Sequence, residues 1–327
     1  MSVEEKRPEE VHIPVLRDEV ISYLAPKPGG KYLDGTLGMG GHTEAILKAA
    51  GEGAQVLGCD RDREAIALAS QRLEPFEGRV HFAHCRFSQF ETALADIGWD
   101  SLDGAMIDIG VSSLQIDDPE RGFSFLEDGP LDMRMGTLGD GTTASSLVNR
   151  ASLEKLKRII GKYGEDPMGG RISRAIIDAR EKKPIETTLE LAKIVEDAYP
   201  AKMRAKARLH PATRTFQALR MEVNQELQEL EGFLEAILPY LKPGARVAVI
   251  SFHSLEDRIV KRFFREEAKG CLCPREQVIC ICGHKAQVKV LTRKPVTAGE
   301  EELERNSRSR SAKLRVAEKL PVTEDDE

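Results

Sequence analysis

A glycine-rich turn between a short apolar run and a predicted helix constrains the fold of this chain more than any other feature. Residues 33–42 read Leu-Asp-Gly-Thr-Leu-Gly-Met-Gly-Gly-His. Glycines let the backbone come close to a ligand, and the first turn of the following helix, predicted over residues 42–50, offers unpaired amide groups. Asp60 closes the next apolar run, residues 54–59. A carboxylate at that strand end can accept hydrogen bonds from ribose hydroxyls, as in nucleotide-binding α/β folds.

The acid in front of the turn, Asp34, indicates the kind of ligand. The glycine spacing is G-x-x-G-x-G, whereas dinucleotide-binding turns read G-x-G-x-x-G. A carboxylate at this point repels a pyrophosphate but suits a ligand that carries an amino group and a sulfonium. The pattern therefore favours a loop that binds S-adenosylmethionine, and a purely structural strand-to-helix turn is the alternative.

Apolar runs and helical segments alternate through the first third of the chain. Residues 80–84 and 102–109 are predicted as the third and fourth strands. Nearly unbroken apolar strands that alternate with helices are typical of a parallel sheet covered on both faces. We therefore predict an α/β fold with a doubly wound, mostly parallel, Rossmann-like sheet of the kind found in S-adenosylmethionine-dependent methyltransferases.

A long polar stretch interrupts this pattern. Residues 117–146 are rich in Gly, Asp and Pro, helical segments follow, and the strand pattern resumes at residues 245–252. Such a long loop inside a compact domain is usually functional or disordered. We predict a first part of a methyltransferase domain over residues 1–115 and an inserted helical subdomain over residues 116–214. The second part of the methyltransferase domain, residues 215–327, begins with a long helix to residue 238 and contains a cysteine hairpin and a basic tail.

Charge is spread unevenly along the chain. The net charge of −6 argues against a protein that coats nucleic acid indiscriminately. Two stretches nevertheless hold no acid, and they are either solvated surfaces or a surface that binds phosphates. Their basic residues are Lys202, Arg204, Lys206, Arg208, Arg214 and Arg220 in the first stretch, and Arg305, Arg308, Arg310, Lys313 and Arg315 in the second.

The first ten residues are charged and acidic, unlike a signal peptide. No apolar run approaches the ~20 residues that span a bilayer. We therefore expect a cytoplasmic protein without membrane contact.

Several side chains at predicted strand ends are candidates for a binding site. Asp108 ends the fourth strand and could accept a hydrogen bond from a substrate amine or a cofactor ammonium, although a cap is the alternative. Phe87 could lie on an adenine ring or belong to the core. His42 could donate to the cofactor or cap its helix. His253 could touch substrate or serve structure alone.

Six cysteines occur in the chain, and four of them are clustered. Cys271, Cys273, Cys280 and Cys282 form two C-x-C pairs on a predicted β-hairpin. In a cytosolic chain such a cluster is not expected to form disulfides, so it either holds a structural zinc or consists of free thiols. We assign no metal ligand among the site residues.

Taken together, these segments resemble the bacterial 16S ribosomal RNA (cytosine-N4)-methyltransferase family, the small-subunit methyltransferase H type. The resemblance extends from about residue 11 to residue 317. The matching motifs are His-Ile-Pro-Val-Leu at 12–16, Asp-Gly-Thr at 34–36 with the turn to His42, Asp-Ile-Gly-Val-Ser-Ser at 108–113, Arg-Gly-Phe-Ser-Phe at 121–125, Asp-Gly-Pro-Leu-Asp-Met-Arg at 128–134, His-Pro-Ala-Thr-Arg at 210–214 and Ser-Phe-His-Ser-Leu-Glu-Asp at 251–257.

The resemblance implies an enzyme that transfers a methyl group from S-adenosylmethionine to N4 of one cytidine in the decoding region of 16S ribosomal RNA. Its partner would be the small ribosomal subunit, and the inserted subdomain would recognise the RNA. The catalytic residue stays unassigned, and a homodimer is left open. The implied cofactor contacts are Gly40, Gly41, His42, Asp60, Phe87, Asp108 and Gln115.

The target amine sets a chemical problem. Its lone pair is delocalised into the cytosine ring, so Asp108 or a nearby carbonyl would have to accept a hydrogen bond from it to restore nucleophilic character. DNA amino-methyltransferases place an aromatic residue just after the corresponding polar residue, where this chain has Val111. We therefore expect Phe123, Phe125 or Phe252 to stack on the base, which must first leave its own stack.

Two other function classes explain less of the sequence. A nicotinamide-dependent oxidoreductase accounts for the sheet, but Asp34 and the missing G-x-G-x-x-G pattern count against it. A non-catalytic ribosome-assembly factor would tolerate decay of the glycine turn, which is intact here.

Overall fold

The computed structural model describes residues 14–136, 141–206, 209–277 and 279–321. The chain forms two compact units, which we call the sheet unit (Met1–Gly110 with Gln228–Glu327) and the helical unit (Val111–Leu227). Several predicted features lie wholly or partly outside the described residues: the charged first ten residues, the start of the 12–16 motif, part of the 117–146 stretch and Arg208. No helix among the described residues is long and apolar enough to cross a bilayer.

The described residues of the sheet unit build a seven-stranded sheet in the order β3-β2-β1-β4-β5-β7-β6. The first five strands run parallel, and β7 lies antiparallel between β5 and β6. This confirms the predicted doubly wound, mostly parallel sheet. The strands are β1 (Lys31–Asp34), β2 (Gln55–Asp60), β3 (Val80–His84), β4 (Leu102–Asp108), β5 (Leu241–Ser251), β6 (Val288–Val290) and β7 (Lys313–Lys319).

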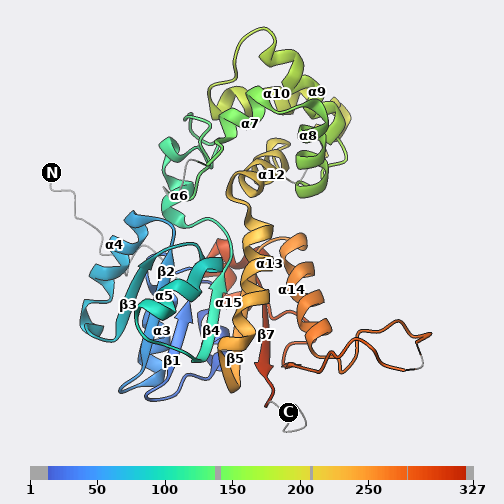
Figure 1. Ribbon diagram of the computed structural model, residues 1–327. Coiled ribbons are helices and arrows are strands. Elements are labelled where there is room, and N and C mark those ends of the chain that lie inside the picture. The colour runs from blue at the N-terminus through green and yellow to red at the C-terminus, as the bar shows by residue number, and fades with distance from the viewer. Residues whose placement is uncertain (1–13, 137–140, 207–208, 278, 322–327) are drawn as a thin grey trace, which may run out of the picture. The chain divides into compact units, whose positions relative to one another are not determined.

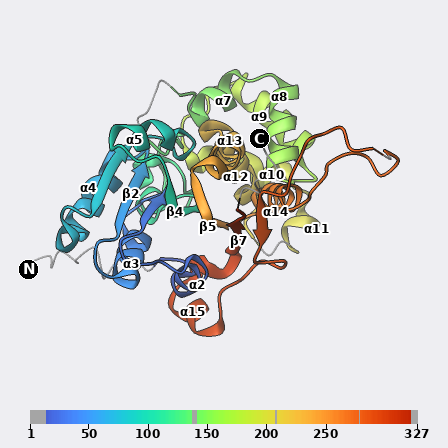
Figure 2. The ribbon, with the colours of Figure 1, turned by 60° about the horizontal axis from the view of Figure 1, so that its bottom comes forward.

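Helices cover both faces of this sheet because successive apolar residues of each strand point to opposite sides. Leu33 packs in one core with α5 (Phe90–Asp96), α13 (Glu226–Ile237) and α14 (Ser254–Glu267). Its neighbour Tyr32 packs in the opposite core. Figure 2 shows the two layers of helices on either side of the strands. The second core is formed with α2 (Arg17–Leu24) and α3 (Gly41–Ala50), and α4 (Arg63–Arg72) packs on Leu37 beside it.

The helical unit has a core of its own, built from the apolar faces of short helices (Figure 1). Hydroxyl side chains start several of them: Thr143, Ser152 and Thr187 each accept a hydrogen bond from the backbone amide three residues on. The helices are α6 (Ser113–Asp117), α7 (Ala144–Arg150), α8 (Leu153–Arg158) with the π-helical turn Ile159–Tyr163, α9 (Gly169–Arg180), α10 (Thr188–Ala198), α11 (Ala201–Arg204) and α12 (Ala212–Asn224).

The predicted helix over residues 215–238 is wrong in one respect, because the structure divides it into α12 and α13. Gln225 adopts a left-handed conformation with φ of 54°, and its amide closes α12 on the carbonyl of Met221. A non-glycine residue in this conformation costs free energy and must be held by its surroundings. The amphipathic pattern continues across the break, so it carries no sign of the bend.

Two further predictions near the C-terminus need correction. The sequence predicts a last strand over residues 287–291, with Arg308 and Arg310 after it. The structure adds a further strand, β7, which follows both arginines. This segment was not predicted as a strand because Arg315, a charged residue that is buried here, interrupts its apolar residues. The cysteine segment is not a β-hairpin: its described residues, 268–277 and 279–287, contain no strand.

Candidate active site

The glycine-rich turn after β1 is held by the acid that precedes it. Asp34 is fully buried, and its carboxylate accepts hydrogen bonds from Thr43 Oγ1 (2.7 Å) and from the amide of Thr36 (3.2 Å). Burial raises its pKa above the ordinary aspartate value. The expectation that Asp34 faces the ligand directly therefore needs correction: this side chain ties the turn to the start of α3.

Two glycines of the turn leave no room for a side chain. Gly40 precedes α3 with φ of 78°, and a Cβ atom there would lie 2.9 Å from Leu73. Gly41 begins the helix, and its Cβ would lie 2.4 Å from Pro14 Cγ. The close approach of backbone and neighbours therefore requires glycine at both positions.

Asp60, at the end of β2, connects the turn to the neighbouring strand. One carboxylate oxygen accepts from the amide of Gly38 (2.8 Å) and the other from the amide of Asp62 (2.9 Å). Burial raises the pKa of Asp60 to about 6 despite these two hydrogen bonds. Since a carboxylate oxygen has two acceptor positions, each oxygen can accept one more hydrogen bond.

Asp108, at the end of β4, lies beside His42 from the second position of α3. Its Oδ2 is 3.6 Å from His42 Nε2. In the described part of the chain, both ring nitrogens of His42 and Oδ1 of Asp108 are buried without a hydrogen-bond partner. Such groups are costly to leave unpaired, so the arrangement favours a polar ligand between them. His42 is not a cap, since Gly40 holds that position.

Thr36 is a residue that the sequence reasoning did not single out. Its hydroxyl oxygen accepts from the amide of Asp108 (2.6 Å) and so joins the turn to β4. Its position directly after Asp34 and Gly35 is the signal that could have indicated it, because a hydroxyl there can bond a neighbouring strand end.

The carboxyl edge of the sheet, where β1 to β5 end, concentrates negative charge. Among the described residues, no Lys or Arg pairs with Asp34, Asp60 or Asp108. Their mutual repulsion contributes to the raised pKa of Asp34 and of Asp60. A ligand that carries positive charge would relieve this repulsion, whereas a phosphate would increase it.

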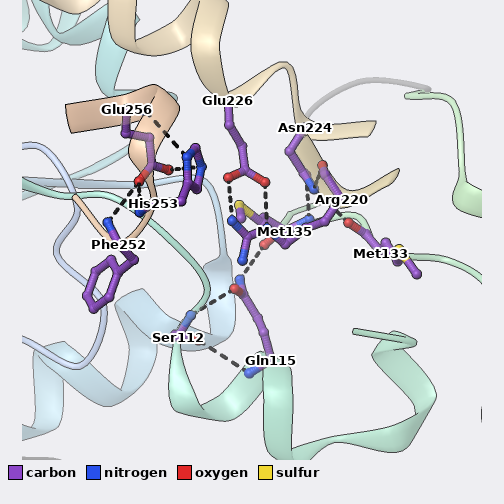
Figure 3. Close-up of polar contacts among 10 residues, drawn as sticks. All are labelled: Ser112, Gln115, Met133, Met135, Arg220, Asn224, Glu226, Phe252, His253 and Glu256. Carbon is purple, nitrogen blue, oxygen red and sulfur yellow. Dashed lines mark hydrogen bonds and ion pairs between the residues drawn. The ribbon is translucent and has the colours of Figure 1, made fainter. Parts of the chain in front are cut away.

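Phe87 and His253 lie at the same edge. Phe87 follows β3 and is half-buried, with its ring edge-on to Phe233 at 5.8 Å between centroids. His253 is the N-cap of α14: its Nδ1 accepts from the amide of Glu256, and its Nε2 lies 2.8 Å from that carboxylate. Glu256 also accepts from the amide of Phe252 (Figure 3). This favours the structural role among the two that the sequence left open for His253.

Gln115 lies in the helical unit, where its buried side chain holds a loop. Its Oε1 accepts from the amide of Ser112, and its Nε2 donates to the carbonyl of Met135 at 2.9 Å (Figure 3). Asn224 supports the same loop through the amide of Met135 and the carbonyl of Met133. The structure thus gives Gln115 a positioning task and does not test its predicted contact with the cofactor.

The expected stacking residues differ in their surroundings. Phe125 packs against His210 and Phe216 at centroid distances of 4.8 and 4.7 Å, within the helical unit. Phe123 packs against the same core. Phe252 is likewise half-buried and packs against the second core of the sheet unit. It lies at the carboxyl edge, where a Cβ atom on Gly110 would approach its ring to 3.4 Å.

The basic stretch 198–221 is partly neutralised by acids from elsewhere in the helical unit. Arg220 forms a bidentate pair with Glu226, with both distances 2.8 Å. Arg204 lies 3.7 Å from Glu196 and 3.6 Å from Asp197. Lys202 and Lys206 are exposed.

The second stretch reaches the carboxyl edge of the sheet. Lys313, the first residue of β7, pairs with Ser251, the last of β5, so the exposed Arg310 lies close to that edge. Arg315 is different: it is buried and paired with Asp257 at 2.6 Å. A separate groove between α14 and β6 is lined by Lys261, Arg265, Lys289 and Arg293 and contains none of the predicted cofactor residues.

Comparison with known proteins adds to this geometry. Residues 9–320 match the sequence profile of the MraW methylase family. The chain is 64% identical over 309 residues to "Ribosomal RNA small subunit methyltransferase H" of Oleidesulfovibrio alaskensis, covering 94% of this chain and 95% of that protein. It is 62% identical over 320 residues to the protein of the same name from Nitratidesulfovibrio vulgaris, covering 98% and 89%.

Two solved structures illustrate a distant likeness in fold. A Streptococcus mutans protein described as a methyltransferase, in complex with SAH, has a TM-score of 0.42 at 11% identity, covering 94% of this chain and 100% of that chain. A tRNA (m1A58) methyltransferase from Aquifex aeolicus has a TM-score of 0.40 at 10% identity, covering 97% and 72%. These scores are too low to bear on the chemistry of this chain.

Proposed function

The chain belongs to the MraW methylase family, and from this premise we propose that it is the methyltransferase that modifies N4 of a cytidine in 16S ribosomal RNA, with S-adenosylmethionine as methyl donor. The proposal rests on the family match over residues 9–320. It is supported by relatives that all carry the name "Ribosomal RNA small subunit methyltransferase H" and are at least 60% identical to this chain. The intact glycine turn and the acidic carboxyl edge supply the chemistry that such an enzyme requires.

The residues at the carboxyl edge fit S-adenosylmethionine. Within the described part of the chain, the buried ring nitrogens of His42 and Oδ1 of Asp108 have no hydrogen-bond partner and can bind polar groups of a ligand, and the acids at the edge favour a cation. We propose that Gly40, Gly41 and His42 hold the ligand from the start of α3. Asp60 accepts from its ribose hydroxyls, which suits a carboxylate with one free acceptor position on each oxygen.

Two predicted contacts have weaker support. Phe87 lies at the end of β3, as an adenine contact would require, but it also packs on Phe233. Gln115 would need to contact the cofactor while its side chain bridges Ser112 and Met135. We keep both as proposals that substitution can test.

When bound, S-adenosylmethionine would supply the methyl group of its sulfonium: the C–S bond breaks with its electron pair left on sulfur, a C–N bond forms with the lone pair of the target amine, and the amine then loses one proton to water. The contribution of the protein is to orient the target amine. Oδ1 of Asp108 can accept a hydrogen bond from that amine and so restore its nucleophilic character. The alternative is that Asp108 accepts from the ammonium of the cofactor. Rate is gained in either case chiefly by positioning.

The helical unit (predicted subdomain 116–214) and the basic residues are proposed to hold the RNA. Phosphate contacts fix the position of a nucleic acid, and base contacts specify the target. Lys202 and Lys206 on one unit, and Arg310 near the carboxyl edge of the other, are exposed cations that suit phosphates. Phe252, at that same edge, is the stacking candidate that the geometry favours.

One experiment tests the function directly. Small ribosomal subunits from a strain that lacks this gene are incubated with the purified chain and S-adenosylmethionine, and the RNA nucleosides are analysed by mass spectrometry. We expect N4-methylcytidine to appear only with the active chain. Methylation at carbon or ribose, or none at all, would contradict the proposal.

The proposed substrate indicates where in the cell the chain acts. We infer that the chain acts in the cytoplasm, where small ribosomal subunits are assembled. The homodimer that the sequence left open is distinguished from a monomer by sedimentation of the full chain with and without RNA.

A further inference from the structure

The loop between α14 and β6 has little apolar material to hold it together. Its two ends are joined, since the amide of Gln287 donates to the carbonyl of Glu267 at 2.7 Å. Between them, the described residues 268–277 and 279–287 form no helix or strand. Among the described residues of the loop, the large apolar side chains Leu272, Ile279 and Ile281 are 43%, 74% and 77% exposed and build no core. In Figure 1 this loop extends away from the layers of the sheet unit.

The four cysteines of this loop nevertheless converge on one point. The sulfur of Cys271 lies 3.4 Å from that of Cys280 and 3.7 Å from that of Cys282, and the latter two are 3.6 Å apart. With Cys273, all four sulfur atoms lie within 4.8 Å of one another. Three of these side chains are exposed, although free cysteine is among the most buried residue types in proteins.

These separations match one particular ligand set. In a tetrahedral site with Zn–S bonds of about 2.3 Å, neighbouring sulfurs are about 3.8 Å apart. A multi-iron cluster would hold its cysteine sulfurs around a body of several atoms and so farther apart. A disulfide would bring two sulfurs to about 2 Å. The three separations among Cys271, Cys280 and Cys282 are instead nearly equal, at 3.4–3.7 Å, as the edges of one tetrahedral face are, and the Cys273 sulfur lies within 4.8 Å of each.

Backbone amides of the same loop point at the sulfurs. The amides of Cys273, Leu272 and Ile281 donate to the sulfurs of Cys271, Cys282 and Cys273 at 3.4, 3.4 and 3.5 Å. Hydrogen bonds of this kind favour the thiolate form that a metal requires, and they orient the ligands as outer-shell contacts do in metal sites.

We propose that Cys271, Cys273, Cys280 and Cys282 bind one Zn²⁺ as a structural Cys₄ site. The ion replaces the missing core of the loop by joining its outgoing and returning halves. It has no part in methyl transfer, because none of the four cysteines belongs to the carboxyl edge. This proposal takes the zinc alternative for the cluster, where the sequence alone led us to assign no metal ligand.

The test uses the full chain, purified without chelator. We expect metal analysis to find about one zinc per chain in the wild type. Cys273→Ser and Cys280→Ser should lose most of it. Arg275→Ser, in the same loop, and Cys85→Ser, outside it, should retain it. Replacement of zinc by Co²⁺ in the wild-type chain should produce the thiolate-to-cobalt charge-transfer absorption of a tetrathiolate site, which needs no variant to fold.

Proteolysis gives a second readout. Trypsin should cut the zinc-loaded chain slowly after Arg275 and Lys285, and removal of the metal by a chelator should speed cleavage there by roughly tenfold or more, because the loop then opens locally. Three results would each overturn the proposal. The purified chain could contain no metal and have all four thiols free for alkylation. Its intact mass could be lower by two or four hydrogens because of disulfides, or it could contain iron in place of zinc.

Discussion

The carboxyl edge of the sheet and the basic stretch 198–221 differ in how their charges are matched. At the edge, Asp34, Asp60 and Asp108 gather without a Lys or Arg partner among the described residues. In the basic stretch, the sequence shows no acid at all, yet Arg204 and Arg220 are paired with carboxylates from other segments. Two cations of the basic stretch are therefore balanced by carboxylates in space, whereas the three acids at the edge have no cationic side chain beside them among the described residues.

Uncompensated buried charge therefore marks a binding site in this protein better than a run of like charges along the sequence does. Burying carboxylates without a cationic partner costs free energy, and such an arrangement is retained where a bound ligand offsets that cost. A paired guanidinium, in contrast, is already satisfied and contributes to stability. We therefore expect substitutions at the edge to affect chemistry, and substitutions in the basic stretch to affect either folding or RNA affinity according to how each cation is paired.

The largest effect is expected from Asp108→Ala. Methyl transfer should fall by roughly a thousandfold, about 4 kcal/mol, because the variant loses an oriented acceptor at the reacting centre. Affinity for RNA should stay nearly intact, since the side chain makes no phosphate contact in this scheme. Single-turnover methylation and RNA binding are measured in parallel. Asp100→Ala, an exposed acid before the same strand, is the control. An equal loss of RNA binding would contradict the proposal that Asp108 acts on the target amine and the exposed cations hold the RNA.

Arg220→Ala should destabilise the helical unit by about 3 kcal/mol, because Glu226 would be left buried without its partner. Hydrogen exchange of the α12 amides in the full chain measures this. The double substitution of Arg220→Met with Glu226→Leu should recover much of the loss. Lys202→Ala, an exposed cation, should change stability by less than about 0.5 kcal/mol. If Arg220→Ala leaves exchange unchanged and weakens RNA binding instead, the pair does not form in solution.

Asp60→Asn should weaken S-adenosylmethionine binding by about 2 kcal/mol, since a charge-assisted acceptor is lost. A pH dependence sharpens the test. Because burial raises the pKa of Asp60 to about 6, the side chain of Asp60 is mostly protonated below pH 6 in the chain without ligand. A ligand that binds the carboxylate form must then displace that proton. Wild-type affinity should therefore fall as the pH drops below about 6. Calorimetry in buffers of different ionisation enthalpy detects the released proton, and Asp60→Asn should flatten the profile.

The smallest effects are expected from single exposed cations. Lys202→Ala and Lys206→Ala should each weaken RNA binding by less than about 1 kcal/mol and reduce the slope of log affinity against log salt by up to about one unit. Arg204→Ala should do less, since Glu196 and Asp197 already compensate that charge. Cofactor affinity should not change in any of the three. A larger effect from Arg204 than from Lys202 would mean that RNA displaces the acids from Arg204.

Local patterns predicted much of the sheet unit. The apolar runs predicted β1 to β5 closely, and the glycine turn predicted the start of α3. Parallel strands end at one edge, so Asp60, Phe87 and Asp108 were expected together, and the structure places them at that edge. The last strand, β7, escaped prediction because Arg315 interrupts its apolar pattern. That charge is tolerated in a buried strand only through Asp257, a partner 58 residues away.

The sequence by itself determined the alternation of strands and helices through β4, the glycine positions and the family, because these depend on periodicity, backbone sterics and motif spacing along the chain. Only the tertiary structure decided which charges are paired, that Asp34 supports the turn from within, that His253 is a cap, and that four sulfurs meet within 4.8 Å. The physical reason is that pairing, burial and metal geometry depend on distances between residues far apart in the chain, about which local pattern carries no information.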